Sequence, residues 1–244
     1  MKVSFLFPLA FSLLILSARS AEPWERAYGE LLKKYATPQG VRYAAWKASA
    51  SDLESLAALT RQIAASGPAT PGRDGELAYL TNAYNIWTLQ GVLEKYPIKS
   101  VRDTAPLFGF FTQSRITVAG EKMSLNKLEK ERILKKFQEP RVHFALNCAS
   151  LSCPPLRDEP YTAPRLEAQL EDATRSFLNG SPFAVQPSAD GKRLMISMIF
   201  DWYAGDFKAS GGPAAFINRY RKEKIREGTK LGYQDYDWSL NAAP

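Results

Sequence analysis

The segment 76–96 constrains the fold most, because it predicts a long helix with two amide side chains on its apolar side. At about 100° per residue, Leu89 and Leu93 fall within about 40° of Asn82, and Asn85 lies about 60° away. A buried amide without hydrogen-bond partners costs about 1–3 kcal/mol. We therefore expect Asn82 and Asn85 either to brace a nearby loop or to belong to a polar site, and the two roles are compatible.

The stretch HFALNCASLSC, residues 143–153, holds the only histidine in the chain and both cysteines. A cysteine attacks as its thiolate, and a neighbouring imidazolium favours that form. A third side chain orients the imidazole through its other nitrogen. The candidates are His143 as base, Cys148 or Cys153 as nucleophile, and Glu129, Asn82 or Asn147 as the orienting group.

The residues alone leave other interpretations of this stretch open. Residues 141–147 predict a buried strand, in which side-chain alternation places His143 and Asn147 on one face. A regular strand would point Cys148 away from His143, although the small residues that follow allow a turn. His143 can also be an ordinary core residue, and Cys148 and Cys153 can form a disulfide. The spacing lacks a C-x₂-C pair and a fourth ligand, so no metal site is predicted.

Glu129 lies in a predicted helix, four residues after Leu125 and four before Ile133. This spacing places Glu129 on the side that faces the core. The alternative is a surface carboxylate paired with Arg132 or Lys130.

The rest of the chain alternates predicted helices with short strands and turns, which predicts an α+β fold of helices packed around a mostly antiparallel sheet. A capping box, Ser51 with Glu54, opens one helix, and Ser124 caps another. The predicted strands are Val41–Trp46, a hairpin turning at Ala119–Glu121, residues 141–147, and a hairpin around Asp190–Gly191. Two later helices are expected over 163–178, with Gly180 just past its end, and from Pro213 to about Arg221.

The first twenty residues have the pattern of a secretory signal peptide. Lys2 precedes an apolar run of about 14 residues, and Ala18 and Ser20 are small residues before a cut at Ala21. No later stretch is apolar enough to span a bilayer. We therefore expect a periplasmic or secreted protein that is not an integral membrane protein.

The chain carries a net charge of +7, which becomes +5 when the predicted signal peptide, with Lys2 and Arg19, is removed. This charge can favour an acidic component of the cell envelope, or it can be an ordinary solubilising surface. No run of basic and aromatic residues indicates a nucleic-acid surface.

Four motifs resemble those of the domain-of-unknown-function 547 (DUF547) family: LTNAYNIWTLQGVLEKYP, MSLNKLEKERIL, RVHFALNCASLSCPPLR and FDWYAGDF. The resemblance implies a relationship to papain-like and transglutaminase-like thiol enzymes, and a Cys–His–Glu constellation formed by Cys148, His143 and Glu129. It also implies binding of a small thiol such as glutathione, and we expect no other cofactor. Lys130 stands where the family usually has a histidine, which makes a metal site still less expected.

We expect residues 21–75 to form a helical segment that packs on a family core at 76–244. Downstream of the cysteines, Arg157 and Tyr161 are candidates for holding a substrate carboxylate, with ordinary surface solvation as the alternative. Three functions follow as hypotheses. The first is a thiol hydrolase or acyltransferase acting on a peptide or isopeptide bond. The second is a redox or glutathione-binding module using Cys148 and Cys153, and the third is a non-catalytic envelope-binding protein.

Overall fold

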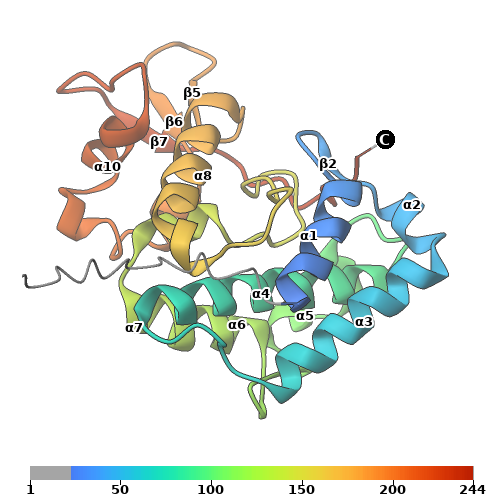
Figure 1. Ribbon diagram of the computed structural model, residues 1–244. Coiled ribbons are helices and arrows are strands. Elements are labelled where there is room, and N and C mark those ends of the chain that lie inside the picture. Colours follow the sequence, from blue (N-terminus) through green and yellow to red (C-terminus); the bar gives the residue numbers. More distant parts are fainter. Residues whose placement is uncertain (1–22, 244) are drawn as a thin grey trace, which may run out of the picture.

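The computed structural model describes residues 23–243, and the predicted signal peptide lies outside the described residues. The described chain is a mixed α/β protein in which helices predominate (Figure 1). The longer helices are α1 (Pro23–Tyr35), α3 (Ala50–Ala65), α4 (Arg73–Lys95), α8 (Leu166–Gly180) and α10 (Pro213–Tyr220). The shorter helical segments are α2 (Tyr43–Lys47), η1 (Val101–Thr104), α5 (Gly109–Thr112), α6 (Leu125–Lys127), η2 (Leu128–Leu134), α7 (Lys135–Phe137), η3 (Pro140–Phe144), η4 (Ala163–Arg165), α9 (Ile199–Trp202) and η5 (Lys208–Ser210).

The strands form three small, separate sheets within residues 23–243, where we had expected one. Two are antiparallel pairs, β1 (Ala36–Thr37) with β2 (Gly40–Val41), and β3 (Ile116–Val118) with β4 (Glu121–Met123). In the third, β6 (Leu194–Ile196) pairs antiparallel with β5 (Val185–Pro187) and parallel with β7 (Leu231–Tyr233). Strands this short cannot enclose a core, so helix packing does so instead.

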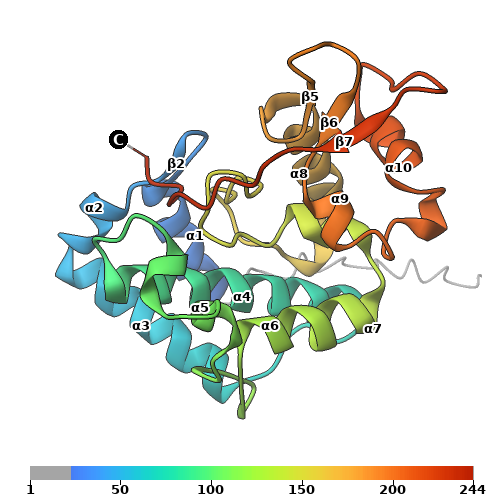
Figure 2. The same cartoon turned by 180° about the vertical axis from the view of Figure 1, so that it is seen from behind.

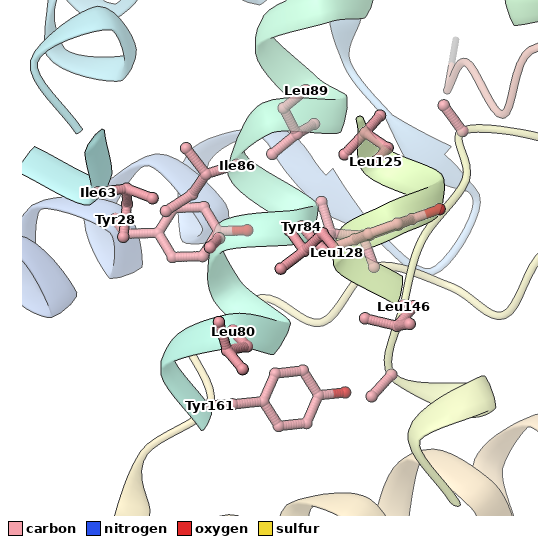
Figure 3. Close-up of a cluster of buried hydrophobic side chains, with 14 of the residues drawn as sticks. Tyr28, Ile63, Leu80, Tyr84, Ile86, Leu89, Leu125, Leu128, Leu146 and Tyr161 are labelled. Carbon is pink, nitrogen blue, oxygen red and sulfur yellow. The ribbon is translucent and has the colours of Figure 1, made fainter. Parts of the chain in front are cut away.

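The first hydrophobic core surrounds α4, which has buried residues on all sides. Figure 3 shows Ile86 on the side of α4 that faces Tyr28 and Ile63, and Tyr84 on the side that faces Leu128. Because α1 and α3 contribute to the same core as α4, residues 23–65 pack directly against the helix that carries both asparagines.

The second hydrophobic core lies between α8, α9 and α10, and it is rich in phenylalanine. Figures 1 and 2 show these helices grouped with β5, β6 and β7 on one side of the molecule, and α1, α3 and α4 on the other. The C-terminal segment runs from β7 back toward β2, as Figure 2 shows. There it forms bridges to Ser150 through Leu240 and to Val41 through Ala242, which join the two sides.

Several local predictions are confirmed. The hairpin turns at Ala119 and Gly120, both with positive φ, and the hairpin near Gly191 also forms. The hydroxyl oxygen of Ser124 accepts a hydrogen bond from the backbone N–H of Lys127, as expected of an N-cap. Helix α10 begins at Pro213.

Two predictions near the N-terminus are wrong. Strand pairing ends at Val41, and residues 43–47 form α2 instead, because this turn buries Tyr43 and Trp46 completely against the first core. Helix α3 is capped by Ser49, whose hydroxyl accepts from the backbone N–H of Asp52, rather than by a capping box at Ser51.

The predicted strand at 141–147 is also wrong. Residues 140–144 form the 3₁₀ helix η3, and an irregular loop follows. The apolar side chains of η3 pack in two different cores, Val142 in the first and Phe144 in the second. The apolar sequence therefore reflects burial on two sides of a turn, which resembles the pattern of a strand buried on both faces.

Candidate active site

A cavity of about 1200 Å³ lies where the two cores meet. Its lining comes from five parts of the chain: Tyr84 on α4, the loop and helix at 107–112, the helical run 126–138, the segment 143–154, and α9 with the residues that follow it. Tyr236 and Trp238 of the C-terminal segment complete it. His143, Cys148, Cys153 and Glu129 all line this one cavity, so the structure brings these predicted residues together.

One wall of the cavity is a π-helix, η2, inserted between α6 and α7. Because a π-helix bonds residues five apart, residues i and i+5 lie on the same side. Leu128 and Ile133 are buried in the first core, whereas Glu129 and Leu134 line the cavity. The prediction that Glu129 points inward assumed α-helical spacing, and the structure places this side chain in the cavity wall, half-buried.

His143 is 5% exposed and held on two sides. Its Nε2 lies 2.8 Å from Oδ2 of Asp206, and its ring packs against the Tyr203 ring with centroids 4.1 Å apart. The ring of Phe207 lies 5.7 Å away. The described partner of the imidazole is thus Asp206, and neither Glu129 nor an asparagine takes that position.

Glu129 instead accepts a short hydrogen bond from the hydroxyl of Tyr203. Burial, followed by the neighbouring carboxylate of Glu129, raises the pKa of Tyr203, so its hydroxyl keeps its proton. Tyr203 thus lies between Glu129 and His143: its hydroxyl bonds the carboxylate and its ring lies against the imidazole.

The loop that carries Cys148 is fixed by the Asn147 side chain. Its amide donates to the carbonyl of Pro154 at 2.9 Å, and its oxygen accepts from the backbone N–H of Ala149 at 3.0 Å. Ala149 has φ +62°, a left-handed conformation that side chains rarely adopt. The backbone N–H of Asn241, on the C-terminal segment, donates to the carbonyl of Ala149 at 3.2 Å. The turn redirects Cys148, so alternation along a strand does not apply to it.

Cys148 is a free, partly exposed thiol with two hydroxyl groups beside its sulfur. Its Sγ lies 3.1 Å from the hydroxyl of Ser150 and 3.1 Å from that of Tyr236, and the Ser150 hydroxyl donates to the Tyr236 oxygen at 3.0 Å. Hydrogen bonding to the Cys153 thiol, then to Ser150 and Tyr236, outweighs burial and lowers the pKa of Cys148 to about 7. A substantial fraction of this thiol is therefore ionised at neutral pH.

Cys153 is also free, but it is buried. Its Sγ accepts a hydrogen bond from the backbone N–H of Cys148 at 3.0 Å, and it lies 3.5 Å from the carbonyl oxygen of Leu146. Burial, followed by hydrogen bonding to Cys148, raises the pKa of Cys153. The two thiols are therefore unequal: Cys148 is the more exposed and has the lowered pKa, and Cys153 is buried and has the raised one. The disulfide considered from the sequence is absent between them.

Asn82 and Asn85 are braces, and neither lines the cavity. Asn82 donates to the carbonyl of Tyr161 at 2.7 Å and accepts from its N–H at 3.0 Å. Asn85 donates to the carbonyl of Ala145 at 3.0 Å and accepts from the N–H of Asn147 at 2.8 Å. Each amide thus satisfies one backbone carbonyl and one backbone N–H of a loop that has no strand beside it. The loop bonded by Asn85 is the one that leads to Cys148.

Arg157 and Tyr161 also lie outside the cavity lining. The guanidinium of Arg157 pairs with Glu159 and Asp172, and the ring of Tyr161 is buried in the first core, beside Leu80 in Figure 3. The structure therefore gives these two side chains local structural contacts and does not direct them toward a substrate.

Sequence reasoning missed Asp206 and Tyr236, which contact His143 and Cys148 respectively. Both lie in segments dense in aromatic and acidic residues, DWYAGDF and YQDYDW, and that composition was the available signal. Cys148 and His143 themselves share no hydrogen bond among the described residues. Within residues 23–243, no group of three or more histidine, cysteine, aspartate or glutamate side chains could hold a metal ion.

Residues 69–178 match a protein family described as "Protein of unknown function, DUF547". Over this segment the chain is similar to that family. The matched segment contains Glu129, His143 and both cysteines, whereas Asp206 and Tyr236 lie beyond its end. No curated protein and no solved structure matches the chain. Within the part of the chain that the structure describes, no helix is both long and apolar enough to cross a membrane.

Proposed function

We propose that this DUF547 protein is a thiol-dependent enzyme, a peptide or isopeptide hydrolase or acyltransferase, with Cys148 as its nucleophile. The observation that carries the proposal is that a partly exposed Cys148, with a lowered pKa, shares a cavity with the hydrogen-bonded pair His143–Asp206. Acyl transfer by cysteine needs a thiolate, a proton carrier and a group that orients the carrier, and we assign these parts to Cys148, His143 and Asp206.

His143 acts as the proton carrier. With Nε2 donating to Asp206, Nδ1 is the nitrogen that remains to accept the thiol proton. The carboxylate of Asp206 then stabilises the imidazolium, in the way that the acid of a catalytic triad does. Because catalytic hydrogen bonds often form fully only with substrate bound, we expect Cys148 and His143 to approach each other in the substrate complex.

The reaction proceeds in two balanced steps. The Cys148 sulfur adds to the carbonyl carbon, and the carbon–nitrogen bond breaks as the leaving amine takes the proton held by His143. Water, or an acceptor amine, then attacks the thioester and gives a proton to His143 while the thiolate departs. The Tyr236 hydroxyl, 3.1 Å from the sulfur, is the donor best placed to stabilise the oxyanion.

This constellation of cysteine, imidazole and carboxylate is the basis on which we propose a relationship to papain-like and transglutaminase-like enzymes. The proposed similarity concerns the three chemical groups and not the fold, which consists of helices with three small sheets among the described residues. It extends to the use of a side chain from a distant part of the chain, Asp206, to orient the imidazole.

An electrophilic peptide probe tests the proposal. We expect a peptidyl acyloxymethyl ketone to label Cys148 stoichiometrically, and Cys148→Ala to abolish labelling. His143→Ala should reduce the labelling rate about 100-fold or more, the usual scale of acid–base assistance. Cys153→Ser is the matched control and should still be labelled. Full labelling of both the Cys148→Ala and His143→Ala proteins would exclude the mechanism.

A second candidate function, a dithiol redox module, is favoured by the contact between the two cysteines. Two thiols would lose two protons and two electrons to an organic peroxide, which is reduced to an alcohol and water. Alternatively, the Cys148 thiolate would attack glutathione disulfide, forming a mixed disulfide with one glutathione as the S–S bond breaks and the second glutathione leaves as its thiolate. Intact-mass measurement after each treatment separates the cases: a loss of two hydrogen atoms or a glutathione adduct supports this function. Unchanged mass, with peptide-probe labelling retained, supports the hydrolase.

We propose export to the periplasm or the exterior, on the basis of the signal-peptide pattern before Ala21. The substrate would then be an extracytoplasmic peptide or small thiol, and an acidic envelope component is a possible docking partner. N-terminal sequencing of the protein from a cell fractionation tests this. A mature chain beginning at Ala21 supports export, and an intact Met1 in the cytoplasmic fraction contradicts it.

A further inference from the structure

The cavity has an aromatic side, of which the proposed chemistry uses only the Tyr236 hydroxyl. Trp202 and Trp238 stack with ring centroids 5.9 Å apart, and Tyr236 lies 4.8 Å and 4.7 Å from them. Phe108 extends this surface, 5.5 Å from Trp238, and Phe111 is 6.4 Å from the same ring. We refer to these five residues as the aromatic shelf. It adjoins the nucleophile, because the Tyr236 hydroxyl contacts Cys148.

The aromatic shelf is uncovered in the described structure. Trp202 is 45% exposed and Phe108 is 43% exposed, and Leu107 beside it is 92% exposed. These side chains come from two loops and a short helix far apart in sequence, so the fold assembles an apolar surface and leaves it open to solvent. An exposed apolar surface beside a reactive group is the mark of a binding site for an apolar group.

The cavity is also lined by two lysines that make no ion pair with a described residue. They are Lys130, on the π-helix η2, and Lys135, the first residue of α7. Their neighbours on the same helical run are paired: Lys127 and Arg132 with Glu121, and Lys136 with Glu76.

Arg102 adds a third cation beside the aromatic shelf. Its guanidinium lies 5.0 Å from the Phe108 ring and 5.8 Å from the Trp238 ring, and no described carboxylate pairs with it. The two acids that line the cavity are already bonded, Glu129 to Tyr203 and Asp206 to His143. The charge left free around the cavity is therefore positive.

We propose that the cavity selects acidic peptides in which a bulky apolar residue is followed closely by a carboxylate. The apolar side chain rests on the aromatic shelf, and Lys130, Lys135 and Arg102 attract the carboxylate. This inference rests on the proposed acyl-transfer function and names its substrate class. A neutral peptide leaves the cations without a partner, and a small acid without an apolar group leaves the shelf uncovered.

Binding is tested separately from chemistry, with the full-length Cys148→Ser protein and tryptophan fluorescence as the signal. The probes are four N-acetyl dipeptide amides, Phe-Glu, Phe-Lys, Ala-Glu and Ala-Lys, with laurate as a fatty-acid comparison. We expect Phe-Glu to bind at least about 10-fold more tightly than each of the others, a difference of about 1.4 kcal/mol. Equal binding of the four dipeptides, a preference for lysine, or binding of laurate alone would overturn the proposal.

Amino-acid substitutions test which side chains cause the preference for each dipeptide residue. The double change Lys130→Glu and Lys135→Glu should reverse the preference for glutamate over lysine, and Trp202→Ala should remove the preference for phenylalanine over alanine. Lys122→Glu, an exposed lysine on β4 outside the cavity, is the matched charge control and should change neither. A reversal by Lys122→Glu as well would show a general charge effect and contradict the assignment.

A parallel measurement on the wild-type protein keeps the two proposals distinguishable. Alkylation by chloroacetamide reports on the thiol alone. If Cys148 reacts while the dipeptides show no preference, the substrate class is wrong and the thiol function stands. If the dipeptides show the expected preference but Cys148 does not react, the thiol function fails, and the cavity is an acidic-peptide binding site.

Discussion

The two hydrophobic cores differ in composition and in what they contribute to the cavity. The first is aliphatic and tyrosine-rich, surrounds α4, and supports the π-helical wall with Glu129 and the lysines. The second is a phenylalanine cluster, in which Phe144, Phe200, Phe207 and Phe216 contact one another, and it supports α9 with Tyr203 and Asp206. His143 lies at the junction, since its neighbours in sequence enter different cores. The site therefore depends on how the two cores are joined.

The largest effect is expected from Phe144→Ala. This ring is 1% exposed and contacts Phe177, Phe200 and Phe216, so its loss should destabilise the protein by about 3–5 kcal/mol. Urea unfolding followed by circular dichroism measures the change. Phe108→Ala, a phenylalanine that is 43% exposed, is the control and should cost much less. Equal costs would show that the second core does not hold the junction.

The second prediction compares the loss of stability when each of the two asparagines of α4 is replaced. Asn85→Ala and Asn82→Ala each leave a buried carbonyl and a buried N–H without a partner, and each should cost about 2–4 kcal/mol. Only Asn85→Ala should also slow alkylation of Cys148 in the folded protein, because Asn85 holds the N–H of Asn147. If Asn82→Ala slows alkylation equally, the loop at Cys148 is not positioned by its own brace.

The third prediction compares the two carboxylates of the cavity walls. Asp206→Asn keeps the size of the side chain but removes the charge that stabilises the His143 imidazolium, so labelling by the peptide probe should slow by about 100-fold. Glu129→Gln should slow it by less than about 10-fold, because Glu129 acts through Tyr203. Labelling rates and circular dichroism spectra of both variants measure this. The reverse order would make Glu129 the group that orients His143.

The smallest effect concerns the pH dependence of Cys148. Because the thiolate is the reactive form and the pKa is lowered to about 7, alkylation should fall as pH falls through about 7. Tyr236→Phe removes a hydroxyl that stabilises the thiolate, so the midpoint should rise by about one pH unit. Rates of iodoacetamide alkylation between pH 5 and about 9 measure both values, a range that brackets the ordinary thiol pKa. An unchanged midpoint would assign the lowered pKa to Cys153 and Ser150.

Short-range signals predicted the parts of the fold that depend on neighbouring residues. The helix α4, the turn at Ala119 and Gly120, and the Ser124 cap each follow from a few adjacent side chains. The segment 140–147 could not be predicted in this way. Its apolar residues are buried by two separate cores, and periodicity alone cannot distinguish that arrangement from a buried strand.

For the candidate site, too, the sequence predicted some features and only the folded structure determined others. The sequence brought His143 and the cysteines to attention because they are the only imidazole and thiols in the chain, and it placed Asn82 and Asn85 on a buried helix. The difference in exposure and pKa between Cys148 and Cys153 depends on hydrogen bonds made in the folded state. No pattern in the sequence gives those bonds.

The sequence by itself determined the chemical groups that are available and the helix that carries both braces. Only the tertiary structure decided that Asp206, 63 positions from His143, is its partner, and that Tyr236, 88 positions from Cys148, contacts the sulfur. The physical reason is that Asp206 reaches His143 from the loop after α9, within the second core, while Tyr236 reaches Cys148 from the C-terminal segment that runs from β7 back toward β2. Such contacts depend on the packing of whole cores, whereas the turns and caps are set by the residues beside them.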